Sequence, residues 1–271
     1  MTVQVAVTGA TGRMGQEVVA AIEARSDCAV AVAVSRQPAE GASVGDVALK
    51  PTADLGELLE QRAVDVLVDF TVPTAAVEYA AACAEADVAF VTGTTGLSDA
   101  EWDALREPSD RVPVLHAPNF SRGIQVLLGL VGDAVAQLPG YDVELVEAHH
   151  NRKRDAPSGT ANRLLEQIES SGEFANAAPD ADGDVDQERT DRVHGREGDQ
   201  PREVGEIGVH AIRAGDITGT HEVMLAANDE VLTLGHRAED RHVFAAGAVD
   251  AAVWIAGRKA GWYEFADVIS Q

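Results

Sequence analysis

The sequence predicts an α/β protein with a doubly wound parallel sheet and a second, α+β domain that carries a mixed or antiparallel sheet. Three observations support this prediction. An apolar strand at 3–7 runs into the glycine-rich stretch TGATGRMG, and an amphipathic helix follows to about Arg25. Strand-like and helical segments then alternate up to about residue 120, which is typical of a parallel sheet. Later segments, at 207–226 and 230–237, have strand character with Gly-containing turns.

The first 120 residues supply the parallel sheet. The segment VDVLVDF at 64–70 is almost continuously apolar, as expected for a strand that is buried on both faces. The other strands of this part are predicted at 3–7, 28–34, 88–93 and 112–117. Helices are predicted between them at 74–86 and 98–107.

The pattern changes after Phe120. We expect an apolar helix at 123–138, a strand at 141–150, a helix at about 158–170 and a closing helix at 241–261. Residues 172–206 are acidic and without clear period, so they are expected to form a long surface loop. Their DADGDVD stretch at 180–186 resembles a calcium-binding loop only superficially. Its glycine comes two residues too early and its twelfth position is Asp191, so no metal site is expected.

The composition is strongly acidic. The chain has 45 Asp+Glu against 21 Lys+Arg, a formal net charge of -24. Such a field repels nucleic acid and anionic membrane surfaces, so neither is an expected partner. Only three of the cations are lysines, Lys50, Lys153 and Lys259. Scarce lysine with acids throughout suggests a salt-rich cytoplasm, where charge repulsion is screened; an ordinary acidic enzyme is the alternative.

The sequence also bears on the compartment. Its first residues, MTVQVAV, have no basic segment and run directly into a strand, so no signal peptide is expected. No apolar run is long enough for a membrane span. Cys28 and Cys83 lie in apolar stretches, which favours buried free thiols in a reducing compartment over a disulfide. A cytoplasmic protein is therefore expected.

The glycine-rich loop predicts a dinucleotide site. Gly9, Gly12 and Gly15 follow the first strand and open the first helix, with Arg13 inside the loop. Glycines allow a tight turn and a close approach of the backbone to a pyrophosphate, and the helix N-terminus offers N–H donors. The alternative is a structural turn.

The end of the second strand bears on the choice of cofactor. Ser35 and Arg36 stand where a site selective for NAD usually has an acidic residue that binds the ribose hydroxyl. A serine and an arginine can accept a 2′-phosphate, so NADPH should be used as well as NADH. A solvated Arg36 is the alternative.

Two further loops are expected at the carboxyl ends of strands, where open sheets of this type bind ligands. GTTG at 93–96 follows the fourth predicted strand, and APNFSRG at 117–123 follows the fifth. Gly93, Thr94 and Thr95 offer backbone and hydroxyl groups to a nicotinamide amide. Taken alone, each loop could equally be a turn.

The stretch EAHHNRKRDAPSGTANRL, at 147–164, predicts a substrate site. It places two histidines at a strand end and a lysine among arginines. Ser158 is expected to cap a helix whose first N–H groups, at Gly159 and Thr160, can bind a carboxylate. The neighbouring arginines should disfavour the proton on Lys153, which suits a proton donor near neutral pH. A solvated turn is the alternative.

These stretches together resemble the 4-hydroxy-tetrahydrodipicolinate reductase family, formerly dihydrodipicolinate reductase, of the diaminopimelate route to lysine. The motifs that carry the resemblance are GATGRMG, GTTG, APNFSRG, EAHHNRKRDAPSGTA and GEIGVHAIRAGDITGTHEV. The likeness runs from Gly9 to about Val268 and is weakest at 172–195. Ser35-Arg36 departs from members that carry an acidic residue before the arginine.

The resemblance implies a Rossmann-type domain of residues 1–120 plus 239–271, and a substrate-binding and oligomerisation domain of residues 121–238 that makes a homotetramer. It implies hydride transfer from NADH or NADPH to a cyclic imine that carries two carboxylates. His149 matches the family's proton donor/acceptor and Lys153 its proton donor. The substrate-carboxylate contacts match His150, Gly159 and Thr160. The cofactor contacts match Gly9, Ala10, Thr11, Gly12, Arg13, Met14, Gly93, Thr94, Thr95, Ala117, Pro118, Asn119 and Phe120.

Two other functions stay open at this stage. One is a different NAD(P)-dependent dehydrogenase that acts on another carboxylated imine or carbonyl compound. The other is a nucleotide-sensing protein that binds the dinucleotide without chemistry. The second gives no reason for His149, His150 and Lys153 to lie together.

Overall fold

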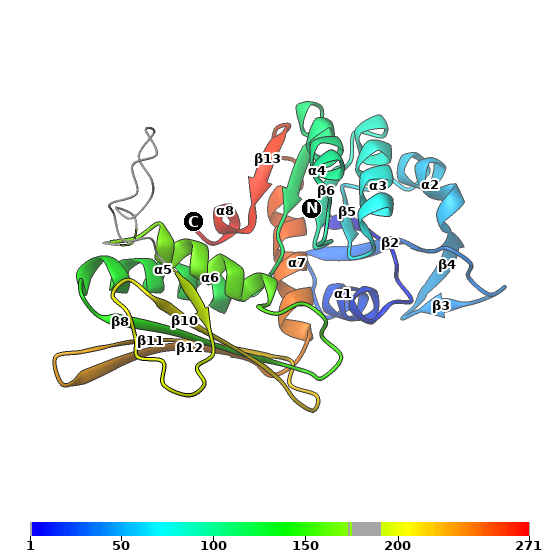
Figure 1. The fold of residues 1–271 in the computed structure, drawn as a ribbon. Helices are drawn as coiled ribbons and strands as arrows, with labels where there is room; N and C mark the ends of the chain where they lie inside the picture. The colour runs from blue at the N-terminus through cyan, green and yellow to red at the C-terminus, as the bar shows by residue number, and fades with distance from the viewer. Residues whose placement is uncertain (1, 173, 175–190, 271) are drawn as a thin grey trace. The chain divides into compact units, whose positions relative to one another are not determined.

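The chain divides into two compact units, each built around its own sheet (Figure 1). The computed structural model describes residues 2–172, 174 and 191–270. The first unit comprises Met1–Arg122 and Arg241–Gln271, and the second comprises Gly123–Asp240. The first unit is therefore made of two separate stretches of the sequence.

The sheet of the first unit is almost entirely parallel. Its strands are β1 Val3–Val7, β2 Cys28–Ser35, β3 Ser43–Val44, β4 Val47–Pro51, β5 Val66–Asp69, β6 Ala89–Thr92, β7 Pro113–His116 and β13 Gly261–Glu264. In the described part of the chain they follow the spatial order β13-β7-β6-β5-β1-β2-β4-β3. The short β3–β4 pair is antiparallel, and the other neighbouring strands run parallel.

Helices cover both faces of this sheet. They are α1 Arg13–Glu23, α2 Leu55–Gln61, α3 Pro73–Glu85, α4 Asp99–Arg106, α7 His242–Ile255 and α8 Phe265–Ile269, with short 3₁₀ turns η1 Thr52–Asp54 and η2 Glu107–Asp110. One apolar core lies between the sheet and α1 and α7, and a second lies between the opposite face and α2, α3 and α4 (Figure 1). This arrangement confirms the predicted doubly wound α/β sheet.

The strand β5 shows why the sequence makes this arrangement. Val66 and Val68 belong to the core under α1 and α7, whereas Leu67 belongs to the opposite core. Successive side chains of a strand point to opposite faces, so a strand covered on both sides needs a continuous apolar run. Full burial of an aliphatic side chain stabilises the fold by about 1.5–3 kcal/mol.

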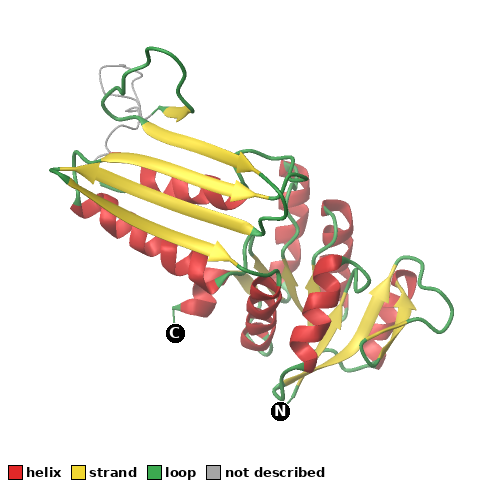
Figure 2. Cartoon of the chain, turned by 90° about the horizontal axis from the view of Figure 1, so that it is seen from below, coloured by secondary structure: helices red, strands yellow, loops and turns green. Residues whose placement is uncertain are grey.

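The second unit contains a mixed sheet with two helices on one face. Its strands are β8 Asp142–His149, β9 Arg192–His194, β10 Ile207–Arg213, β11 Gly219–Ala227 and β12 Glu230–Ala238, and its helices are α5 Arg122–Gln137 and α6 Gly159–Glu169. Among the described residues the strand order is β12-β11-β8-β10-β9. β8, β10 and β9 run parallel, while β11 is antiparallel to both β8 and β12. Figures 1 and 2 show α5 and α6 along the same face of this sheet. The mixed sheet confirms the predicted second fold element.

Four strands were not predicted from the sequence, and two of them, β3 and β4, lie at 43–51, where no element was expected. β9, Arg192–His194, lies inside the segment that was expected to be a loop, and it pairs with β10. β13 lies where the closing helix was expected to continue, because α7 ends at Ile255 and Gly257 adopts a left-handed φ of 77° that stops the helix. The stretch DADGDVD lies outside the described residues.

Both cysteines lie in the first unit. Cys28 and Cys83 are buried free thiols, as predicted. Burial raises the pKa of both thiols, which disfavours the reactive thiolate. Within the described ranges, none of the helices combines the length and apolar character that a bilayer crossing requires.

Candidate active site

The glycine-rich loop forms a compact turn at the start of α1. Gly9 has a φ of 58°, and its carbonyl accepts a hydrogen bond from the Gly12 N–H at 2.8 Å. A Cβ atom at Gly15 would lie 2.2 Å from that same carbonyl oxygen, so only glycine lets α1 pack this closely. No side chain caps the N-terminus of α1 at Gly12. The loop therefore leaves helix N–H groups for a pyrophosphate, which fits a dinucleotide.

The end of β2 lies beside this loop. The hydroxyl groups of Ser35 and Thr11 are 3.1 Å apart, and the Ala10 N–H donates to the Val34 carbonyl at 3.1 Å. Arg36, the next residue, is exposed and has no ion pair within the part of the chain that the structure describes. Its guanidinium is therefore available at the edge of the loop.

A buried carboxylate joins the strand ends around the same edge of the sheet. Asp69, at the end of β5, is 0% exposed. It accepts hydrogen bonds from the hydroxyls of Thr8 at 2.8 Å, Thr71 at 2.6 Å, Thr92 at 2.9 Å and Thr94 at 2.7 Å. These residues belong to, or directly follow, β1, β5 and β6. Asp69 thus holds three neighbouring loops together, a role that sequence reasoning missed.

This network changes the expectation for GTTG. The Thr94 hydroxyl donates to Asp69, the Thr94 N–H donates to the Thr92 hydroxyl at 3.1 Å, and the Gly93 N–H donates to the Asp69 carbonyl at 2.9 Å. The Thr94 hydroxyl and the N–H groups of Gly93 and Thr94 thus already have partners within the protein, and a contact of this loop with a nicotinamide amide stays a prediction. Thr95 is exposed and keeps that possibility.

The loop after β7 is partly core. Ala117 and Phe120 are buried, and the Phe120 ring packs edge-on against Phe70 and Phe265, with centroids 5.6 and 5.2 Å apart. Pro118 is exposed and Asn119 is half-buried, with its side-chain oxygen accepting from the Ser121 N–H at 2.8 Å. Of the earlier loop, Ala10 is core, Met14 packs against it, and Arg13 is exposed. Any cofactor contact at the core residues would therefore use their backbone.

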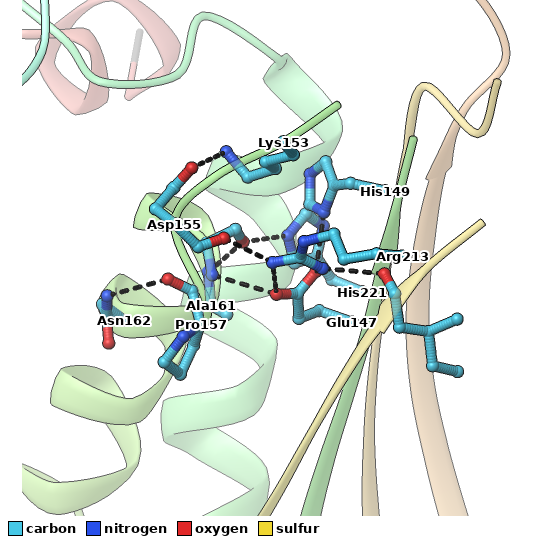
Figure 3. Close-up of polar contacts among 11 residues, drawn as sticks. Glu147, His149, Lys153, Asp155, Pro157, Ala161, Asn162, Arg213 and His221 are labelled. Carbon is cyan, nitrogen blue, oxygen red and sulfur yellow. Dashed lines mark hydrogen bonds and ion pairs between the residues drawn. The ribbon is translucent and has the colours of Figure 1, made fainter. Parts of the chain in front are cut away.

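The histidine and lysine stretch lies in the second unit, at the end of β8 (Figure 3). Glu147 is 0% exposed, and its Oε2 accepts from His149 Nδ1 at 2.6 Å. Arg213 of β10 donates to both carboxylate oxygens, at 2.8 and 2.6 Å. The Ser158 N–H donates to Oε1 at 3.0 Å. One carboxylate, that of Glu147, thus contacts the end of β8, the neighbouring strand β10 and the start of α6.

Burial and charge set the protonation of this group. Burial lowers the pKa of His149, and the positive charges of Lys153 and Arg213 act in the same direction, while Glu147 opposes them. Burial raises the pKa of Glu147, but the hydrogen bonds from Arg213 and His149 outweigh it and hold the pKa below its ordinary value. At neutral pH the pair is a carboxylate and a neutral imidazole.

A second histidine supports the start of α6. His221 of β11 is buried, and its Nε2 lies 3.0 Å from the Ser158 hydroxyl. That hydroxyl also accepts from the Ala161 N–H at 3.1 Å, which confirms Ser158 as the N-cap. Burial lowers the pKa of His221 to about 3, so His221 is neutral. Its ring packs edge-on against His149, with centroids 5.2 Å apart.

Lys153 has an acidic partner. Its Nζ lies 2.9 Å from Asp155 Oδ1, and its side chain is 22% exposed. Arg152 is paired with Asp216 at 3.0 Å. The sequence analysis considered only the arginines next to Lys153. In the structure, Asp155 pairs with Lys153 and Asp216 pairs with Arg152, so part of the positive charge of this stretch is neutralised. Figure 3 shows Lys153, Asp155 and His149 gathered around the Glu147–Arg213 pair.

The remaining predicted residues lie on the same turn. His150 is half-buried and its carbonyl accepts from the Lys153 N–H at 3.1 Å. Gly159 is exposed and Thr160 half-buried, and both lie in the first turn of α6. The second unit thus brings His149, His150, Lys153, Gly159 and Thr160 into one turn between β8 and α6.

Sequence reasoning missed Glu147, Arg213 and His221. Register explains how they meet: Arg213 pairs with His149 across β10 and β8, and His221 pairs with Glu147 across β11 and β8. The signal available in the sequence was the two-residue period of the strand. Glu147 falls two residues after Leu145 and four after Val143, and therefore on the same buried face. A carboxylate in such a core-facing position requires a buried partner.

No group of three or more His, Cys, Asp or Glu residues in the described ranges is arranged to hold a metal ion. The groups that the site does offer are acids, bases and helix N-termini, in addition to the glycine-rich loop of the first unit. A histidine held by a buried carboxylate, a lysine and the N-terminus of a helix together suit the reduction of an anionic substrate.

Comparison with known proteins agrees with this chemistry. Residues 3–120 match the family model for the dihydrodipicolinate reductase N-terminus, and residues 123–269 match that for its C-terminus. The chain is 49% identical over 265 residues to 4-hydroxy-tetrahydrodipicolinate reductase of Natronomonas pharaonis, covering 98% of this chain and 99% of that protein. It is 48% identical over 266 residues to the reductase of the same name from Haloarcula marismortui, covering 98% of each.

Solved structures of similar fold include a dihydrodipicolinate reductase. The dipicolinate-bound dihydrodipicolinate reductase from Paenisporosarcina sp. TG-14 superposes with a TM-score of 0.76 at 23% identity, over 97% of this chain and 98% of that one. An amine dehydrogenase from Mycobacterium smegmatis gives a TM-score of 0.62 at 15% identity, covering 97% and 95%. Because the family matches span both units, the chain belongs to the dihydrodipicolinate reductase family.

Proposed function

We propose that this protein reduces 4-hydroxy-tetrahydrodipicolinate to tetrahydrodipicolinate with NADPH or NADH, in the diaminopimelate route of lysine biosynthesis. The observation that carries the proposal is the arrangement of His149. Its ring is fixed by the buried Glu147, and it lies on the same turn as Lys153 and the start of α6. Membership of the reductase family supports the choice of substrate.

The two basic side chains have separate roles in this proposal. The reaction consumes one hydride and one proton and releases water. Glu147 accepts from Nδ1 of His149, so Nε2 is the atom that takes up or releases a proton. The Lys153 ammonium, held by Asp155, is the second proton donor. Protonation beside the reacting carbon makes that carbon a better hydride acceptor.

The start of α6 holds a substrate carboxylate. The N–H groups of Gly159 and Thr160 lie in its first turn, where the helix dipole favours negative charge. His150 contributes a further contact from the preceding turn. A substrate with two carboxylates is thereby oriented for proton transfer.

The first unit holds the cofactor, whose nicotinamide supplies the hydride when bound. The backbone of Gly9–Met14 faces the pyrophosphate, and Arg36 binds the 2′-phosphate of NADPH. Gly93–Thr95 and Ala117–Phe120 contact the nicotinamide half, mainly through the backbone and the exposed Thr95.

The proposal is tested by following the near-ultraviolet absorbance of NADPH after adding freshly prepared 4-hydroxy-tetrahydrodipicolinate. Rapid loss of absorbance is the expected result. Binding of NADPH without oxidation would favour the nucleotide-sensing alternative. Oxidation with other carboxylated imines but not with this substrate would favour a different dehydrogenase.

We place the reaction in the cytoplasm, without nucleic acid or membrane as a partner. Two buried thiols suit a reducing compartment, and a net charge of -24 repels polyanions.

We further propose that the protein is a homotetramer that associates through the sheet of the second unit. Among the described helices, α5 and α6 cover one face of this sheet, and Figure 2 shows the other face open. Apolar side chains lie on the open face, with Ile212 47% and Val231 63% exposed. Apolar surface of this kind is typical of an interface between subunits.

Val231→Glu is expected to shift the protein to smaller assemblies, because it places a charge within the proposed contact, where it would lose its hydration. Sedimentation velocity in molar KCl measures the change. Val72→Glu is the matched control, since Val72 is 55% exposed in the first unit. Identical sedimentation of the Val231 variant and the native protein would contradict the interface.

Salt is expected to stabilise the protein. With a formal charge of -24, the folded chain repels itself in dilute buffer, and unfolding spreads the charges apart. At about 1 M salt the Debye length is near 3 Å and most of this repulsion is screened. The melting temperature should therefore rise from dilute buffer to molar KCl, as scanning calorimetry would show. A melting temperature that stays flat or falls over this range would refute adaptation to a salt-rich cytoplasm.

A further inference from the structure

We infer that Glu147 is a positioning residue that sets the orientation of His149 and the placement of the α6 N-terminus together, with Arg213 as its fixed counter-ion. The inference deepens the proposed function and rests on it. The observation behind it is one buried carboxylate that contacts the strand end, the helix start and the neighbouring strand (Figure 3).

The carboxylate is fully used. Oε2 accepts from His149 Nδ1 and from Arg213 Nη1, while Oε1 accepts from the Ser158 N–H and from Arg213 Nη2. All four distances lie between 2.6 and 3.0 Å. Each oxygen thus has two donors, which satisfies the lone pairs of an ionised carboxylate. A neutral side chain of the same shape could not accept all four bonds.

The first consequence concerns the imidazole of His149. A carboxylate only accepts hydrogen bonds, so the neutral ring carries its proton on Nδ1. The lone pair is then on Nε2, which is turned away from Glu147. A Cβ atom built at Gly219 would lie 3.2 Å from Nε2, so the glycine leaves room at the atom that exchanges a proton with the substrate.

The second consequence concerns α6. The Ser158 N–H is held by Glu147, and the Ser158 hydroxyl is held by Ala161 and His221. The residue that begins the helix is therefore fixed relative to the histidine ring. One carboxylate sets the separation between the proton-transfer atom and the N–H groups that bind the substrate carboxylate.

Arg213 completes the arrangement. Besides its two bonds to Glu147, it donates to the Asp155 carbonyl at 2.6 Å, and Asp155 binds Lys153. A buried carboxylate without a partner is strongly destabilising, whereas a bidentate arginine offsets the loss of hydration. Arg213 thus keeps Glu147 ionised and links it to the turn that carries the lysine.

Glu147→Gln tests the inference. Glutamine keeps the shape, but its NH₂ group cannot accept from His149 or Arg213. We expect kcat to fall about 10- to 100-fold, a cost like that of removing the partner that orients a metal-binding histidine. NADPH affinity should stay the same, because the glycine-rich loop lies in the first unit.

The pH profile separates positioning from simple destabilisation. Glu147 raises the pKa of His149 against burial, so its loss should lower that pKa further. The limb of the kcat/KM profile that reports His149 should move to lower pH. The other charged or titratable groups that act on His149 are unchanged in the variant: Lys153, Arg213 and His221.

Glu169→Gln is the matched control. Glu169 also forms a bidentate pair with an arginine, Arg192, at 2.6 and 2.7 Å, but at the far end of α6. It should leave both kcat and the pH profile unchanged. A Glu147 variant with native kcat and an unmoved limb would overturn the inference.

A second measurement is made on the native protein and does not require the Glu147 variant to fold. The ¹⁵N resonances of histidine in the native protein report which ring nitrogen carries the proton, and a His149→Asn variant assigns the signal. A proton on Nδ1 is expected, and a proton on Nε2 would overturn the inference. If the native protein failed to oxidise NADPH with the substrate, the proposed function would fail, and this resonance would still test the role of Glu147.

Discussion

Lys153→Ala is expected to lower turnover by about 10²–10⁴-fold, the usual contribution of a positioned general acid. Lys153 lies on the turn between β8 and α6, with its Nζ fixed 2.9 Å from Asp155 Oδ1. Alanine removes the ammonium that we propose as the proton donor to the substrate. The affinity for NADPH should be unchanged, because the glycine-rich loop belongs to the other unit.

The measurement combines steady-state rates with a fluorescence titration of NADPH. Lys259→Ala is the control, since Lys259 is exposed and has no ion pair among the described residues. Its rate should equal that of the native protein. A Lys153 variant that retained more than about half of the native activity would rule out the proton-donor role.

Arg36→Ala should raise the KM for NADPH by about 10- to 100-fold while changing the KM for NADH much less. A charge-assisted hydrogen bond to a phosphate is worth roughly 1.5–3 kcal/mol, which corresponds to this range. Arg36 directly follows Ser35, whose hydroxyl lies 3.1 Å from that of Thr11 in the glycine-rich loop. Its guanidinium is therefore beside the glycine-rich loop, where we propose that it binds the 2′-phosphate.

Arg62→Ala is the control for this variant. Arg62 is exposed in the same unit and likewise has no ion pair within the described ranges. Both KM values should be unaffected by its loss. An equal increase for NADPH and NADH in the Arg36 variant, or no increase, would show that Arg36 does not bind the phosphate.

Local patterns were enough to predict much of the fold. The apolar run of β5 and the glycines before α1 are short-range signals, because each depends on the backbone of a few adjacent residues. Ser158 was recognised as an N-cap for the same reason. β9 and β13 were missed because they are three and four residues long and are held by pairing with distant strands.

The site was predictable only in part. His149, Lys153 and Gly159 lie within one stretch of sequence, so composition and spacing were informative there. The Glu147–Arg213 pair was not predictable in this way, since the two residues are 66 positions apart and meet only through the β8–β10 register. The hydrogen bond that the Thr94 hydroxyl donates was not predictable either, because its acceptor, Asp69, is 25 positions earlier in the sequence.

The interruption of the first unit has a consequence for how the chain is made. Ala245 and Val249 of α7 share a core with Val18 and Ile22 of α1, and Asp250 binds Arg25 at 2.6 Å. A nascent chain that has reached Arg122 therefore still lacks the helix that covers this core. The inserted unit is synthesised before that helix. At about 5–20 residues per second, its synthesis takes on the order of 10 s.

During that interval the nascent N-terminal segment exposes apolar surface that only the last part of the chain can cover. The order of synthesis and the order of completion are therefore reversed, because the inserted unit can finish folding before the unit that began the chain. Chains truncated after Asp240 and released from the ribosome should be protected from protease in the second unit but cleaved readily in the first.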